Sequence, residues 1–155
     1  MNNRGQVWQV DFLIALFFVI LIYIITYNYV TSLSPPTSLE DLSSDTFYAS
    51  EILLGEGIPS DWNASNVIQA GLITDGELDR DKIDAFFAMA PTAQRILIGA
   101  ESKYHITFYN QSNQLNFSGN SFIGTFPVNA KQSASVTRFA VLDGYVIKMQ
   151  VTLWD

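Results

Sequence analysis

The chain has 155 residues, of which 48% are hydrophobic and 14% aromatic, so it has enough apolar side chains to fold around a core. Its formal net charge of −7 argues against nucleic acid and anionic lipid as partners. The absence of cysteine excludes a disulfide framework, a thiolate nucleophile and a zinc–thiolate site.

A long apolar segment, residues 12–30, dominates the N-terminal part of the chain. Its nineteen residues span about 28 Å as a helix, close to the ~30 Å hydrocarbon core of a bilayer. Aromatic residues that favour membrane interfaces stand at both ends, with Trp8 before the segment and Tyr27 and Tyr29 near its end. A buried helix of a soluble protein is the alternative, but it requires a larger domain than this chain can build. We therefore predict a transmembrane helix.

The distribution of basic residues predicts the orientation of this helix. Arg4 precedes it and the next basic residue is Arg80, so the positive-inside rule places the N-terminus in the cytoplasm and the chain after Thr31 outside. Ser32-Leu33-Ser34 is a poor signal-peptidase site, so we expect the anchor to be retained. The expected parts are a leader (1–5), a transmembrane and assembly helix (6–30), a linker (31–37) and an extracellular head (38–155).

The residues before the apolar segment resemble a known processing signal. A short basic leader ends in Arg4-Gly5-Gln6, and an acidic residue, Asp11, stands just ahead of the long apolar run. This arrangement resembles the class III signal of archaeal type IV pilins. The resemblance implies that a prepilin peptidase cleaves after Gly5, that Gln6 becomes the mature N-terminus, and that the helix is kept as the filament core. Asp11 then corresponds to the acid near the fifth mature position, although it is sixth when counted from Gln6, and Trp8 stands where many archaeal signals have Ser.

Asp11 has a physical interpretation that does not depend on the family. A lone carboxylate at the end of an apolar helix is costly unless it is paired or lies near the headgroups. The α-amino group released at Gln6 is a natural partner, and on a neighbouring subunit it would set the axial register. The alternative is a carboxylate that reaches the water at the membrane interface.

Local patterns predict helices in the first half of the head. Pro35 and Pro36 end the helical segment, and Ser38 begins a capping-box pattern with Asp41. Apolar residues then recur at helical spacing up to Gly55 (Leu39, Leu42, Thr46, Ala49 and Leu53). An ordered loop, 55–63, follows, with Trp62 as its apolar plug.

The acidic run 75–81 suggests calcium but lacks the EF-hand pattern, so we interpret it as a helix start with Asp79 as N-cap and Asp81 in the first turn. The apolar stripe of this helix is Ile83, Phe86, Phe87 and Ala90. Thr92 is expected to cap another short helix, which continues to Ile98 and ends at Gly99.

The apolar period changes to two after Lys103, which predicts strands. Tyr104, Ile106 and Phe108 alternate with more polar residues, and 110–131 is rich in turn residues around one or two short strands. Asp143-Gly144 predicts a type I′ turn, followed by one apolar face (Tyr145, Ile147, Met149, Val151 and Leu153). The expected fold class is α+β: a long N-terminal hydrophobic transmembrane helix, then a single extracytoplasmic head with short helices and a mostly antiparallel sheet.

Sequence motifs for catalysis are absent. His105 is the only histidine, which excludes a His-pair metal site, and it is expected on the surface of a strand; no phosphate loop or nucleophile elbow occurs. We predict no enzyme activity, no metal and no cofactor. Asn63, Asn110 and Asn116 begin Asn-x-Ser triplets and are candidate N-glycosylation sites.

The head also resembles a recurring type of archaeal pilin-like extracellular protein, through the stretch 57–62, Gly71-Leu72 and the hairpin 138–154. The leading hypothesis is a structural or minor subunit of a type IV pilus-like filament at the cell surface. Its precursor would be anchored in the cell membrane, and its partners would be a prepilin peptidase and other pilin subunits. The alternative is a single-pass anchored extracellular domain that senses or binds a ligand and does not polymerise.

Overall fold

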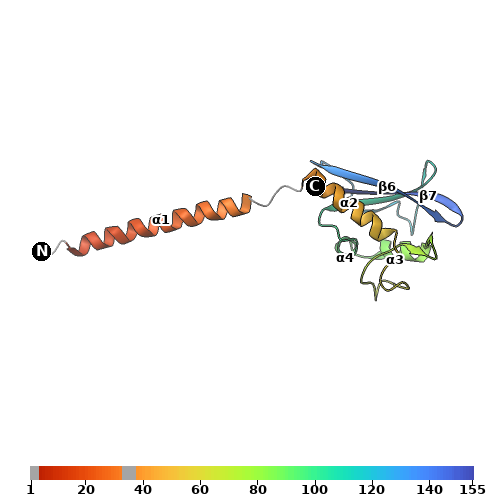
Figure 1. Ribbon diagram of the computed structural model, residues 1–155, viewed down its shortest axis with the longest axis horizontal. Helices are drawn as coiled ribbons and strands as arrows, with labels where there is room; N and C mark the ends of the chain where they lie inside the picture. The colour runs from red at the N-terminus through yellow and green to blue at the C-terminus, as the bar shows by residue number, and fades with distance from the viewer. Residues whose placement is uncertain (1–3, 33–37) are drawn as a thin grey trace. The chain divides into compact units, whose positions relative to one another are not determined.

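The computed structural model describes residues 4–32 and 38–155, and the chain divides into two compact units, Met1–Pro36 and Thr37–Asp155. Figure 1 shows the two units, which are described separately below. Residues 1–3 of the predicted leader and residues 33–37 of the predicted linker lie outside the described residues. Thr31 and Ser32, which we expected in the linker, still have helical backbone.

The N-terminal unit is one helix, α1 (Arg4–Ser32), of 29 residues. The predicted helical form of the apolar segment is thus confirmed, and the stretch Asp11–Tyr29 is long and apolar enough to cross a membrane. All side chains from residue 11 to residue 29 are exposed within this unit. Because apolar side chains surround the helix, its stability in the cell requires an apolar environment.

The head begins with helix α2 (Leu39–Leu53), which starts at the predicted capping box. The Ser38 hydroxyl oxygen accepts a hydrogen bond from the Asp41 amide (3.1 Å), and the Asp41 carboxylate accepts one from the Ser38 amide (3.3 Å). Two backbone donors that a helix start leaves open are thereby satisfied. The predicted apolar stripe is buried from Leu42 to Leu53, but Leu39 is exposed because the first turn does not reach the core.

A small hairpin and two short helices follow α2. The hairpin pairs β1 (Ile73–Thr74) with β2 (Glu77–Leu78), and then come α3 (Arg80–Ala88) and α4 (Pro91–Leu97). The hairpin was missed in the sequence, although Asp75-Gly76 has the same turn chemistry as Asp143-Gly144, with φ of 52° and 84°. Thr92 is not a cap, because Pro91 occupies the first helical position and Ala90 precedes it as an N-cap without a side-chain bond.

A five-stranded antiparallel sheet forms the second half of the head. The strand order is β4 (Asn113–Gln114), β3 (Lys103–Asn110), β7 (Tyr145–Trp154) and β6 (Ser133–Leu142), with β5 (Phe122–Gly124) also paired to β3. The helices lie on one side of this sheet (Figure 1). The α+β class and the antiparallel sheet are confirmed.

The β6–β7 hairpin turns at Asp143 and Gly144, whose φ values of 52° and 77° are those of the predicted type I′ turn. Its register pairs Leu142 with Tyr145 next to the turn and continues to the pair Ser133 and Trp154. One face of β7 is buried as expected, at Ile147, Met149, Val151 and Leu153. Tyr145 was expected on that face, but beside the turn it extends beyond the helical layer and is exposed.

The loop between α2 and β1 is held by Trp62, which is only 3% exposed and confirms the predicted plug. Its indole nitrogen donates a hydrogen bond to the carbonyl oxygen of Gly71 (2.7 Å). A Cβ at Gly71 would lie 2.1 Å from the amide nitrogen of Gly57 and 2.4 Å from the carbonyl oxygen of Gly55. Two backbone segments therefore approach each other so closely that only glycine fits.

We expect Gly71→Ala to lower the free energy of unfolding of the head by about 3 kcal/mol or more, because the added methyl group meets rigid backbone. Gly119→Ala is the matched control: its Cβ meets nothing within 4 Å, and only the φ of 84° opposes it. The control should cost about 1–2 kcal/mol. Urea unfolding of the detergent-solubilised chain, followed by tryptophan fluorescence, measures both, and equal losses would contradict the proposed close approach.

Candidate functional site

The predicted processing site lies at the start of α1. Gly5 and Gln6 have helical backbone, and Asp11 is the first residue of the exposed apolar stretch. Five residues along a helix correspond to about 7.5 Å of rise and about 140° of rotation. An amino group released at Gln6 and the Asp11 carboxylate of the same helix therefore lie on different faces. Pairing between two neighbouring helices meets no such constraint.

The ion pairs of the described side chains both lie in the head. They join Arg80 to Asp143 (2.8 Å) and Arg138 to Glu51. Asp11 has no ion pair with any described side chain. Its carboxylate is thus available for a partner outside the described part of the chain.

The three candidate glycosylation sites differ in their surroundings. Asn63 and Asn116 are exposed, whereas Asn110, at the end of β3, is half-buried. The Asn63 side-chain oxygen accepts a hydrogen bond from the Ser65 amide (2.9 Å), which places this triplet in a tight surface turn. In the triplet of Asn116, the Ser118 hydroxyl donates a hydrogen bond to the Asp84 carboxylate (2.8 Å). Asn63 and Asn116 are therefore both accessible, and Asn110 is less so.

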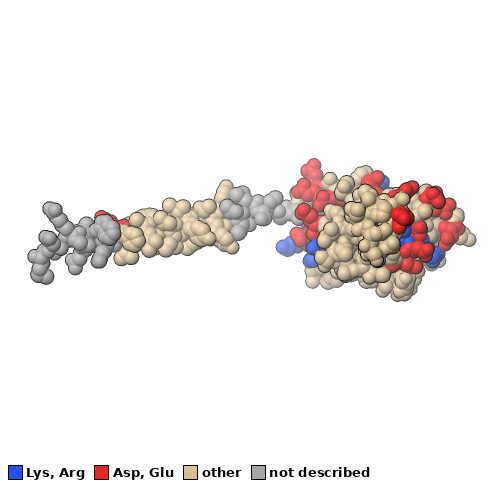
Figure 2. Space-filling view, turned by 90° about the horizontal axis from the view of Figure 1, so that it is seen from below, with Lys and Arg blue, Asp and Glu red and all other residues tan. Residues whose placement is uncertain are grey.

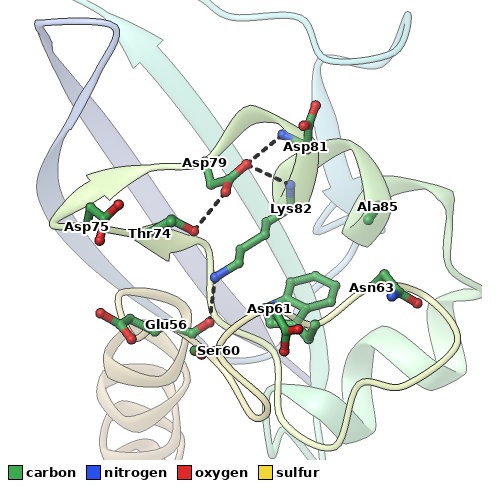
Figure 3. A pocket seen from close by; sticks show the side chains of 11 residues that line it. Glu56, Ser60, Asp61, Asn63, Thr74, Asp75, Asp79, Asp81, Lys82 and Ala85 are labelled. Atoms are coloured by element: carbon green, nitrogen blue, oxygen red, sulfur yellow. Dashed lines mark hydrogen bonds between the residues drawn. The ribbon is translucent and has the colours of Figure 1, made fainter.

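An acidic hollow of about 440 Å³ opens between the 55–63 loop, the β1–β2 hairpin and the start of α3 (Figure 3). Carboxylates line it, and the Lys82 side chain crosses its floor, as Figure 3 shows. The Lys82 ammonium donates hydrogen bonds to the carbonyl oxygens of Glu56 and Ile73, both at 2.8 Å. Lys82 is 5% exposed, so it ties three segments together from inside.

Asp79 caps α3 as predicted. Its carboxylate accepts hydrogen bonds from the Asp81 amide (2.9 Å), the Lys82 amide (3.2 Å) and the Thr74 hydroxyl (2.7 Å). Burial alone would raise the pKa of Asp79, but the hydrogen bonds from Thr74, Lys82 and Asp81 and the charge of Lys82 outweigh it, so the pKa lies below its usual value. The carboxylate nearest the lysine is thus fully occupied in holding the helix start.

The polar contacts of this hollow join its three segments. Within residues 11–29 and 38–155, no three His, Asp or Glu side chains gather closely enough to hold a metal ion. The Lys82 side-chain nitrogen is engaged by the carbonyl groups of Glu56 and Ile73. The sequence did not indicate the burial of Lys82, because its acceptors are backbone atoms from distant segments.

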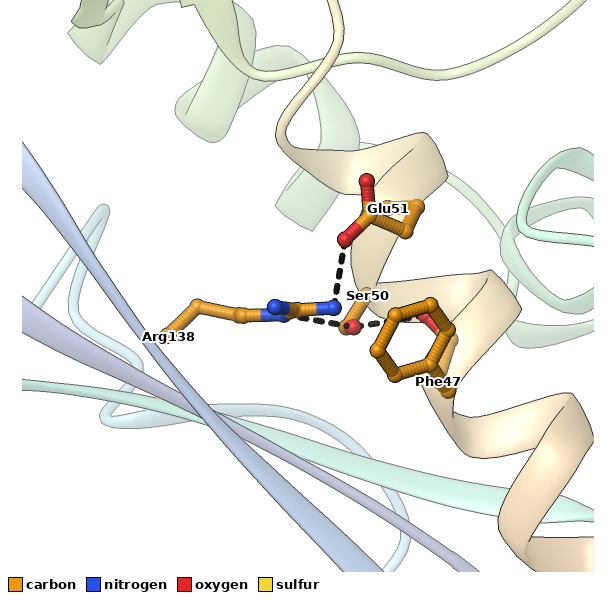
Figure 4. A network of polar contacts seen from close by, with 4 residues as sticks. All are labelled: Phe47, Ser50, Glu51 and Arg138. Atoms are coloured by element: carbon orange, nitrogen blue, oxygen red, sulfur yellow. Dashed lines mark hydrogen bonds and ion pairs between the residues drawn. The ribbon is translucent and has the colours of Figure 1, made fainter.

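A second polar contact joins the edge strand β6 to α2 (Figure 4). The Arg138 guanidinium forms an ion pair with Glu51 and lies over the Phe47 ring, with its carbon 4.5 Å from the ring centroid. Its Nε donates to the Ser50 hydroxyl (3.1 Å). Arg138 pairs across the sheet with the buried Met149, so it occupies the core-facing side of β6. The alternation along β6 was the signal that sequence analysis could have used.

We expect Arg138→Ala to destabilise the head by about 1–2 kcal/mol, because it removes the charge–ring contact, the Ser50 hydrogen bond and the packing of the aliphatic stem. Arg80→Ala is the control, because Arg80 is exposed and loses only the ion pair with Asp143 and a more distant contact with the Phe117 ring (5.8 Å). It should change stability by less than about 0.5 kcal/mol. Urea unfolding of both variants measures the difference. If the two variants lose equal stability, Arg138 does not anchor the edge strand.

His105 lies in an aromatic cluster on the other side of the sheet. Its ring centroid is 5.0 Å from those of both Phe122 and Phe126. Its Nδ1 and the Trp154 Nε1 are the buried side-chain nitrogens without a hydrogen-bond partner in the described part of the chain. Burial lowers the pKa of His105, and a backbone hydrogen bond to Thr125 offsets part of this effect. This strand histidine is therefore half-covered by rings rather than open to solvent.

The lowered pKa of His105 predicts a pH-dependent stability. The unfolded chain takes up a proton below about pH 6.5, whereas the folded head takes it up only at lower pH, so stability should decline as the pH falls from about 7 to about 5. His105→Phe should flatten this decline, and no other histidine contributes. Urea midpoints of both proteins at several pH values provide the measurement, and parallel curves would contradict the assignment.

No family model matches this sequence, and comparison with curated proteins and with solved structures likewise finds no match.

Proposed function

We propose that this chain is a structural or minor subunit of a type IV pilus-like filament, made as a membrane-anchored precursor and processed by a prepilin peptidase. The observation that carries the proposal is α1, which continues as one helix from the predicted cleavage point through the whole apolar stretch. A helix that is apolar on all sides suits both successive environments, first the lipid and then a bundle of like helices.

The position of Asp11 supports the pairing between subunits. An amine in an apolar bundle needs a counter-charge, and the 140° between Gln6 and Asp11 favours a carboxylate from the neighbouring helix over the one on the same helix. Each pair would then fix the axial position of one subunit against the next. The carboxylate and the amine would thus set the rise of the filament.

The head supports a passive role. Its acidic hollow is held by a lysine bound to carbonyl groups, and its carboxylates cap helices or lie at the rim. We therefore propose a subunit without enzyme activity, metal or cofactor. The expected location is the cell surface, with the precursor N-terminus in the cytoplasm and the head outside. Asn63 and Asn116, which are both exposed, are the preferred acceptors if the host attaches N-linked sugars.

The alternative function is an anchored extracellular domain that binds a ligand and does not assemble. The open acidic hollow favours this alternative, since a cationic ligand could enter it. The two functions share one topology and differ in the fate of residues 1–11. The N-terminus of the native protein therefore separates them.

We expect Gly5→Val to leave the leader attached, because a branched side chain before the scissile bond blocks entry to the peptidase. Asp11→Ala should leave cleavage intact and weaken assembly, because the released amine would lose its counter-charge. Asp11→Glu is the matched control and should restore filaments at least in part.

Mass spectrometry of the N-terminus and electron microscopy of the cell surface are the two measurements. An intact Met1 on the native protein would falsify processing and with it the filament subunit. A mature N-terminus at Gln6 without filaments would support processing of the precursor but contradict its assembly into a polymer. For a simple anchored receptor, none of the three variants should change the processing of the N-terminus or the location of the protein.

A further inference from the structure

The charges of the head are divided between its two layers. Residues 38–102, which form the helices and the small hairpin, contain twelve Asp or Glu and three Lys or Arg. Residues 103–155, which form the large sheet, contain two Asp or Glu and four Lys or Arg. Figure 2 shows acidic side chains outnumbering basic ones on the face seen there. The head therefore has a strongly acidic helical layer and a weakly basic sheet.

The side of the sheet that faces away from the helices has an apolar and basic surface, which we call the outer patch. It consists of the exposed Phe139 and Val146 and the half-buried Tyr109, Val141 and Lys148. The strand register aligns Phe139, Lys148 and Tyr109 in one row and Val141 with Val146 in the next, on the face opposite the buried Met149. Phe139 is 68% exposed and Val146 64%. Apolar side chains gathered in this way mark an interaction surface.

The cations of the outer side have no carboxylate partner among the described residues. Lys148 lies over the Tyr109 ring (4.3 Å) and Lys103 over the Trp154 ring (4.4 Å), whereas both ion pairs of the head involve other residues. No Asp or Glu occurs between residues 103 and 142. The charge of Lys148 is therefore available to an acidic partner.

The complementary surface lies on α2. A shallow groove there, the α2 groove, is lined by Leu39, Glu40, Ser43, Ser44 and Phe47. It combines the exposed apolar side chains of Leu39 and Phe47 with the carboxylate of Glu40. The Arg138 guanidinium, which lies over the Phe47 ring, is already paired with Glu51. The apolar hollow beside α4 is a poorer match, because it is lined by alanine, valine, methionine, leucine and isoleucine without a carboxylate.

We propose that the outer patch of one head docks into the α2 groove of a second copy of this chain. The contact buries Phe139 and Val146 against Leu39 and Phe47 and brings Lys148 near Glu40. Because α2 packs against the opposite face of the sheet, a head cannot make this contact with itself. Each copy therefore has one outer patch and one α2 groove, and the same contact can repeat from copy to copy.

This inference rests on the proposed filament, in which the helix bundle holds the heads at high local concentration. A contact between tethered partners needs little intrinsic affinity, because the second binding event becomes intramolecular. Opposite charges favour the head-to-tail arrangement, since two like layers facing each other would repel. The same polarity predicts that high salt weakens the contact, as the Debye length falls to about 3 Å at 1 M.

Cysteine cross-linking of the full-length chain tests the proposal cleanly, because the chain has no native cysteine. Two tagged copies are co-expressed, one with Val146→Cys and the other with Ser44→Cys, and treated on intact cells with a short bifunctional maleimide. We expect a mixed dimer on a denaturing gel. Lys148→Glu in the first copy should lower its yield roughly two- to fivefold, and Glu40→Lys in the second should restore it.

Two controls make the result specific. Val146→Cys paired with Ser60→Cys, on the rim of the acidic hollow, should give little product, and so should Val146→Cys with itself. A dominant product from either control overturns the proposal. Filaments in the microscope without the Val146–Ser44 product also overturn it while leaving the filament function intact. The Val146–Ser44 product without filaments supports the docking of two heads and contradicts the filament.

Discussion

The structure of the head depends on strand β7, which lies between two partners along its length. It pairs with β6 over ten residues and with β3 over eight, and the turn at Asp143 and Gly144 sets the first of these registers. Side chains alternate between the faces of a strand, so a slip of one residue would move the row from Ile147 to Leu153 out of the core. The helices have no other apolar surface of this size to cover. The turn and the buried row thus specify the same register of β7 against β6.

The N-terminal unit obeys a different constraint. The side chains described there, those of residues 11–29, form no continuous polar face, so no side of this stretch is suited to contact with water. Lipid and a bundle of identical helices both satisfy this requirement, and neither demands a particular side of the helix. Asp11 is the exception, because its carboxylate favours one rotation of the helix about its axis and one depth in the apolar environment. One charged residue in an otherwise uniform surface can therefore define where each helix stops.

Local signals in the sequence predicted most of the elements. The capping box of Ser38, the Asp79 cap and the Asp143-Gly144 turn depend on residues within a few positions of one another, and all three are confirmed. The burial of Lys82 depends on segments that meet only in the folded head, and no local pattern contains it. For Arg138, the alternation along β6 indicates the side of the strand but not the partners on α2. The error at Thr92 arose because Pro91 is an equally good start one position earlier. The processing site and the pairing of Asp11 concern events between molecules, so the fold of one chain does not test them.

Arg138 has a further consequence for the open side of the sheet. In the described strands, β6 pairs only with β7, so alternate residues along its ten-residue length present unpaired amide and carbonyl groups at the edge of the sheet. Such a row is a template with which another extended chain can pair. A strand added there would cover the guanidinium of Arg138 and force it to lose water without gaining a second carboxylate. The residue that anchors the edge from inside thereby also protects it from fibrous growth.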